Sequence, residues 1–207
     1  ENITKEDWLD MSEDLLEEEL WKYSVDGANE QMYQGLRPAR GKAIRYRDLL
    51  TAIHVAYAWM PTMLWKDGSK LLDEQNRQEF RTKYTRAFNR YLKSYKSELP
   101  KCEDVKYLMK FTNNSVVGLS KVLHIFDPIH FPIWDSRVAR NFYWLRTDNP
   151  QVGSKVNWYL KWLETSRKWA RDEIVIQRIN ELKQEYDFLQ GMKSLRVVEL
   201  VVFCWQE

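Results

Sequence analysis

The stretch that decides the fold runs from Ser115 to Arg140 and reads SVVGLSKVLHIFDPIHFPIWDSRVAR. Its first half, as far as Phe126, is mostly apolar, and Ser115 or one of the two asparagines before it can cap a helix there. The Asp-Pro pair that follows predicts a turn. An extended apolar piece then leads to Asp135, which stands where a helix N-cap would stand. The stretch therefore predicts a helix, a tight connection and a second helix.

Helical periodicity continues outward on both sides of this stretch. A capping box at Thr4 to Asp7 predicts the start of a first helix. The further helices expected are 44–65 with a kink or restart at Pro61, 70–97, 103–111, 115–126, 135–146, 155–171, 172–189 and 195–205. Only 7 Gly and 6 Pro are present, which favours long helices over many short strands. We expect an all-α, compact multi-helix bundle with a helix-hairpin-helix or helix-turn-helix-like element near 115–146.

The length predicts a single domain over residues 1–207, which we expect to bind DNA. Its expected parts are an acidic N-terminal helix over 1–30, the core element over 113–146, and C-terminal helices over 153–206. Residues 1–30 hold eleven Asp and Glu against two Lys and Arg, whereas the remaining residues hold 19 against 30. A basic body with an acidic end is typical of a protein that binds a polyanion, although an ordinary solvated surface gives the same balance.

Several classes of site and location are not indicated. The two cysteines and three histidines lack metal-ligand spacing, so we expect neither a metal nor a cofactor. No stretch approaches the roughly 18 apolar residues of a membrane span, and the acidic N-terminus does not resemble a signal peptide. We therefore expect an intracellular monomer, in the nucleus, the cytoplasm or the nucleoid.

A basic stripe lies on the helix expected at 70–97. Lys83, Arg86, Arg90 and Lys93 recur three and four residues apart, so they share one face. Such a stripe can follow DNA phosphates, which makes Arg86 and Arg90 candidate DNA contacts. The alternative is a solvated helix face.

Lys121 and Asp135 are the candidate chemical residues. A lysine on an apolar helix either extends outward or points into a pocket. Gly118, one turn earlier, permits close backbone approach. The alternative is that Asp135 only caps a helix, Lys121 lies on the surface and Trp134 belongs to the core.

The order Gly118, Lys121, Pro132, Asp135, Val138, Arg140 resembles the core of the helix-hairpin-helix DNA glycosylases, including proteins similar to 8-oxoguanine DNA glycosylase. The likeness covers about 30 residues, and this chain has one glycine and no proline in the expected hairpin. The resemblance implies that Lys121 attacks C1′ of the sugar and that Asp135 stabilises the charge developing there. It also implies DNA contacts from Gly118, Ser120, Ser136, Arg137 and Arg140, with Trp134 lining a pocket for an extruded base.

A second resemblance is to the DNA-binding domain of base-J-binding proteins, in which an aspartate on a recognition helix holds a glucosylated thymine. Asp135 would then accept hydrogen bonds from sugar hydroxyls, and no bond would break. The two resemblances agree about Asp135 and differ about Lys121. We expect a protein that recognises a modified base in double-stranded DNA through Asp135. The alternatives are an active N-glycosylase/lyase using Lys121 and Asp135, or a base-hypermodification enzyme on the same scaffold.

Overall fold

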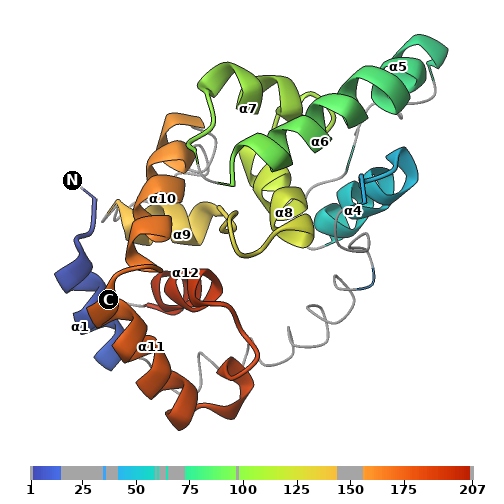
Figure 1. The fold of residues 1–207 in the computed structure, drawn as a ribbon. Helices are drawn as coiled ribbons and strands as arrows, with labels where there is room; N and C mark the ends of the chain where they lie inside the picture. The colour runs from blue at the N-terminus through green and yellow to red at the C-terminus, as the bar shows by residue number, and fades with distance from the viewer. Residues whose placement is uncertain are drawn as a thin grey trace.

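The computed structural model describes residues 2–14, 35, 42–58, 60, 64, 73–96, 98–143 and 156–205. These residues form helices and connecting segments without any β-strand, so the all-α prediction is confirmed (Figure 1). The α-helices are α1 (Lys5–Glu13), α4 (Tyr46–Ala58), α5 (Glu74–Glu79), α6 (Thr85–Ser94), α7 (Cys102–Met109), α8 (Val116–Phe126), α9 (Ser136–Phe142), α10 (Val156–Trp169), α11 (Glu173–Glu185) and α12 (Ser194–Cys204).

The predicted capping signals are present in the structure. Thr4 and Asp7 form a reciprocal capping box at the start of α1, and Ser115 and Asp135 cap α8 and α9. The helix expected at 70–97 is described over 74–94, where α5 and α6 are joined by a π-helical turn at Phe80–Tyr84. Thr85 stabilises this turn because its hydroxyl donates to the Phe80 carbonyl oxygen at 2.8 Å.

Some expectations fall outside the described residues. They concern the region around Pro61, the remainder of the acidic segment after Asp14, and the end of the helix expected at 135–146. Within the described part, α9 ends at Phe142.

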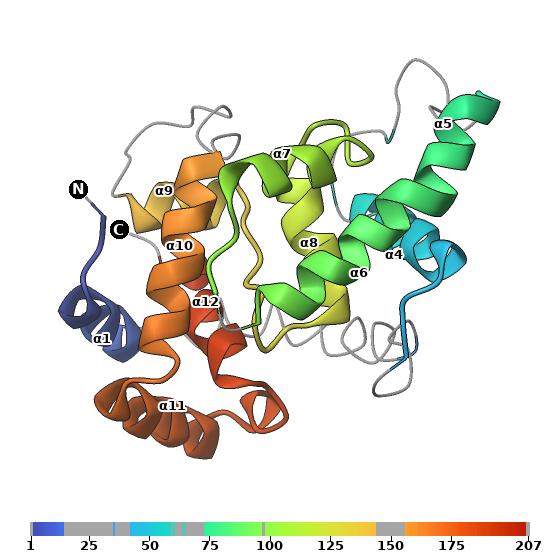
Figure 2. The same cartoon turned by 45° about the horizontal axis from the view of Figure 1, so that its top comes forward.

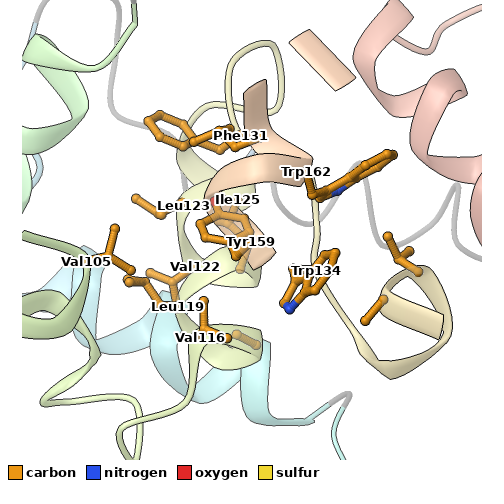
Figure 3. Close-up of a cluster of buried hydrophobic side chains, with 14 of the residues drawn as sticks. Val105, Val116, Leu119, Val122, Leu123, Ile125, Phe131, Trp134, Tyr159 and Trp162 are labelled. Carbon is orange, nitrogen blue, oxygen red and sulfur yellow. The ribbon is translucent and has the colours of Figure 1, made fainter. Parts of the chain in front are cut away.

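The core is organised around two nearly apolar helices. Helix α8 packs against α4 and α7, and helix α12 packs against α1, α9, α10 and α11 (Figures 1 and 2). Figure 3 shows the α8 side chains meeting Trp134, Tyr159 and Trp162 from the segments beside them. The last helix, α12, belongs to the core, because most of its residues are buried.

The N-terminal helix closes the C-terminal half of the bundle. The Trp8 indole N–H donates to the Val198 carbonyl oxygen at 3.1 Å, and the Ile3 N–H donates to the Phe142 carbonyl oxygen at 2.8 Å. Arg178 on α11 donates to the hydroxyl and the carbonyl oxygen of Ser12 at 3.0 and 2.9 Å. Segments far apart in the sequence are thus joined by specific hydrogen bonds as well as by apolar packing.

In the part of the chain that the structure describes, every helix is too short or too polar to cross a bilayer.

At Gly118 the side chain of Tyr57 from α4 packs closely against the backbone of α8. A Cβ atom placed on Gly118 would lie 2.8 Å from the Tyr57 hydroxyl oxygen and 3.0 Å from a ring carbon of Tyr57. The close backbone approach expected at Gly118 is therefore made by a tyrosine of this protein.

Gly118→Ala is expected to lower the free energy of unfolding by about 1–3 kcal/mol, because the added methyl overpacks the contact with Tyr57. An unobstructed Gly→Ala change inside a helix would instead raise the free energy of unfolding by roughly 1 kcal/mol. The sign of the measured change therefore shows whether the methyl group is obstructed. Urea denaturation measures the difference. Gly191→Ala is the control, because a Cβ there has no neighbour within 4 Å. Stabilisation by Gly118→Ala would show that Tyr57 moves aside freely.

Candidate functional site

The site begins with an extended segment, residues 131–134, that crosses the interior between α8 and α9. Its backbone belongs to no helix or sheet, so buried side chains must satisfy its polar groups. His124 bonds the Phe131 carbonyl oxygen through Nδ1 at 2.9 Å, which requires a proton on Nδ1. The Ser120 hydroxyl accepts from the Trp134 N–H at 2.9 Å. Two side chains of helix α8 therefore fix the path of this segment.

The same segment is held from its other side by α10 and α12. The Trp162 indole N–H donates to the Ile133 carbonyl oxygen at 3.1 Å, and the Ile133 N–H donates to Glu199 Oε2 at 2.6 Å. Glu199 is 1% exposed and also pairs with Arg196 one turn earlier on α12. A buried carboxylate needs such partners. The segment leading to Asp135 is consequently held by hydrogen bonds from three helices.

Asp135 occupies the position that the sequence predicts, at the N-cap of α9. Its Oδ1 atom accepts from the backbone N–H groups of Arg137 and Val138 at 3.0 and 2.9 Å, so the cap does not use Oδ2. Burial raises the pKa of the Asp135 carboxyl, against the lowering effects of the Val138 N–H, the Lys121 charge, the Arg137 N–H and the Arg196 charge. The ionised form is thus less stable here than in water. A ligand that donates a hydrogen bond to this carboxylate would relieve that cost.

Lys121 and Asp135 act on each other. Lys121 is partly exposed on α8, and its positive charge is the largest charge effect on the Asp135 carboxyl. Arg196 contributes a second positive charge from α12. The two residues singled out in the sequence therefore belong to one electrostatic cluster, together with a residue that the sequence analysis did not single out.

The remaining candidates near Asp135 divide by exposure. Ser136 is exposed, and Arg137 and Arg140 are partly exposed along α9, with the Arg137 guanidinium 4.9 Å from the centre of the Phe203 ring. These three residues are placed where a nucleic acid can reach them.

Gly118, Ser120 and Trp134, by contrast, are buried. Trp134 has no exposed surface and lies in the cluster of Figure 3, so its stacking on a base would require the segment to open. In the closed structure these residues pack against the protein itself.

Arg86 and Arg90 lie elsewhere. Both are exposed on α6 and line a groove of about 500 Å³ formed with α7. The groove takes no residue from α8 or α9, so the structure does not bring these arginines into the Asp135 cluster. Among the described residues, no group of three metal-ligating side chains occurs.

Glu199 and Arg196 are the site residues that sequence reasoning missed. The available signal was a single carboxylate inside the apolar run of the last helix, three residues after an arginine. Such a charge must find partners when the helix is buried. Its partner in the 131–134 segment is 66 residues away, and no local pattern indicates that pairing.

Glu199→Gln is expected to lower the free energy of unfolding by about 2 kcal/mol, because the change weakens a charged hydrogen bond to the Ile133 N–H and leaves Arg196 without its carboxylate. Glu181→Gln is a matched control, since Arg178–Glu181 has the same spacing at the surface. That control is expected to cost at most about 0.5 kcal/mol. Urea denaturation of both variants makes the test, and equal losses would contradict the proposed anchoring role.

Comparison with protein-family models, curated proteins and solved structures finds no match for this chain. The likenesses to the helix-hairpin-helix glycosylases and to base-J-binding domains therefore rest on the residues between Gly118 and Arg140 alone.

Proposed function

We propose that the chain binds double-stranded DNA and recognises a modified base through Asp135. The observation that carries the proposal is the state of this carboxyl: burial raises its pKa, its Oδ2 atom is not used by the helix cap, and its position is fixed by the hydrogen-bonded segment before it. A pre-positioned, poorly solvated carboxylate is suited to accept hydrogen bonds from a ligand. Hydroxyl or amino groups of a modified base supply such donors.

The surroundings of Asp135 are consistent with a nucleic acid. Lys121 and Arg196 place positive charge beside the carboxyl, and Arg137 and Arg140 follow on the helix that it caps. Cations at this position would contact phosphates and set the register of the duplex, while the carboxylate would read the base. The excess of Lys and Arg after residue 30 supports the same assignment.

A second function is favoured by the coupling of Lys121 to Asp135. In a glycosylase/lyase the lysine amine attacks C1′ of the sugar, the base leaves, and a Schiff base forms. The effect of the Lys121 charge on the Asp135 carboxyl supports the first requirement of this chemistry, namely that nucleophile and carboxylate share one site. The role of Lys121 thus distinguishes an enzyme from a protein that only binds the modified base.

Recognition of a modified base is tested by measuring the affinity of the chain for duplexes that carry glucosylated 5-hydroxymethyluracil, 8-oxoguanine or only ordinary bases. Asp135→Asn keeps the helix cap, because asparagine caps as well as aspartate, but removes the charge. We expect this variant to lose roughly tenfold or more in its preference for the modified duplex while retaining its affinity for plain DNA. Fluorescence anisotropy at fixed salt provides the affinities.

The control is Asp172→Asn, which alters another N-cap aspartate whose Oδ1 also accepts two backbone N–H groups. Its base preference is expected to match that of the unmodified chain. If the wild-type chain binds modified and plain duplexes equally, recognition of a modified base is excluded for the bases tested.

The enzyme function is tested by borohydride trapping on the same duplexes. A lyase is expected to give a covalent protein–DNA adduct that disappears in Lys121→Gln and persists in Lys161→Gln, an exposed lysine on α10. Protein that binds the duplexes but yields neither adduct nor abasic product would exclude the glycosylase for those bases.

A further inference from the structure

The groove between α6 and α7 is a separate feature with its own chemistry. It has a volume of about 500 Å³, within the usual range of small-ligand sites. Its lining residues are Lys83, Arg86, Ala87, Arg90, Tyr91, Ser94, Tyr95, Asp104, Tyr107 and Leu108. Figure 2 looks onto the two helices that form it.

One wall of the groove is basic. Lys83, Arg86 and Arg90 lie on one face of the helix, and within the described ranges none of them forms an ion pair. Neighbouring lysines do form ion pairs. Lys110 Nζ lies 2.6 Å from Glu79 Oε2, and Lys96 Nζ lies 3.6 Å from Asp127 Oδ2. Three cations without carboxylate partners attract an anion, and a concave surface concentrates their field.

The opposite wall and the floor are aromatic. Tyr107 on α7 is 39% exposed, so part of this aromatic residue is accessible to a ligand. Tyr91 is buried, and its hydroxyl has no hydrogen-bond partner among the described residues. The one carboxylate in the groove, Asp104, accepts a hydrogen bond from the Tyr95 hydroxyl at 2.5 Å. The groove therefore combines net positive charge with exposed aromatic surface.

The helix beside the groove departs from regular α-helical geometry at Phe80–Tyr84. Lys83 belongs to the π-helical turn Phe80–Tyr84, and Tyr84 is anchored to α7 because its hydroxyl donates to the Leu108 carbonyl oxygen at 2.5 Å. A π-helical turn is less favourable than regular helix and is found frequently at functional sites. Here it lies where the basic wall begins and joins the two walls of the groove.

We propose that this groove binds a nucleoside phosphate, with the phosphate on Lys83, Arg86 and Arg90 and the base against Tyr107. Cations alone would suit any anion, and a ring alone would suit any flat apolar ligand, whereas their combination suits a nucleotide. The nucleotide is either free or part of a single strand. This site does not rest on the function proposed for Asp135, because the two share no residue.

The probe is a fluorescent oligothymidylate of about eight nucleotides, within the usual range of single-strand site sizes. Arg86→Ala/Arg90→Ala is expected to weaken binding at least tenfold and to reduce the salt slope by about 0.7 for each phosphate that is no longer neutralised. Tyr107→Ala is expected to weaken binding at least about fivefold with an unchanged salt slope, because stacking does not release counterions. Competition by thymidine monophosphate determines whether a free nucleotide is also accepted.

The control is Lys93→Ala, since Lys93 is a cation exposed on the same helix that does not line the groove. It is expected to change affinity less than twofold. Asp135→Asn is expected to bind the probe normally, so a failure of the Asp135 site is distinguishable from a failure here. The proposal is overturned if Arg86→Ala/Arg90→Ala behaves like Lys93→Ala, or if an abasic strand of equal length binds as tightly as the oligothymidylate.

Discussion

The structure depends on the hydrogen bonds that the backbone N–H and carbonyl groups of the buried segment 131–134 make. An extended chain in an apolar interior is unstable unless each N–H and carbonyl group finds a partner, and this protein has no sheet among its described residues to supply them. The partners come instead from Ser120 and His124 on α8, Trp162 on α10 and Glu199 on α12. Together these bonds join the segment to three helices, so the segment sets the relative position of all three. Arg167 adds to this by donating to the carbonyl oxygens of His130, Tyr95 and Glu98.

The hydrogen-bonded segment both fixes the position of the Asp135 carboxyl and holds it where burial raises its pKa. Asp135 directly follows the segment, so its position is inherited from the hydrogen bonds before it. A free surface aspartate would be solvated and mobile, and it would discriminate weakly between ligands. Holding the carboxyl where burial raises its pKa costs stability when it is ionised, and nearby cations offset part of this cost. Such a balance occurs at binding sites and also in structural ion-pair networks.

The helices and their starts could be predicted from the sequence because their causes are local. The capping box at Thr4, the cap at Asp135 and the inward faces of α6 and α8 each depend on residues within a few positions. The roles of Ser120 and Glu199 could not be predicted in this way, because their partners are 14 and 66 residues distant. Arg86 and Arg90 were identified from their spacing, whereas the groove that they line exists only because α7 folds back beside α6. Local patterns therefore indicated which charged residues share a helix face, and the tertiary structure determines which of them lie beside residues of other helices.

The contact between α1 and the C-terminal helices has a consequence for how the chain folds. Trp8 bonds the backbone at Val198, and Arg178 bonds Ser12, so α1 finds these partners only after the 190 residues that separate Trp8 from Val198 have been made. Ribosomes add roughly 5–20 residues per second, which separates the synthesis of these two partners by about 10–40 s. During that interval the Trp8 side of α1 has no native surface to cover it. Closure of α1 onto α11 and α12 is therefore a long-range step that must wait until both of those helices have been synthesised.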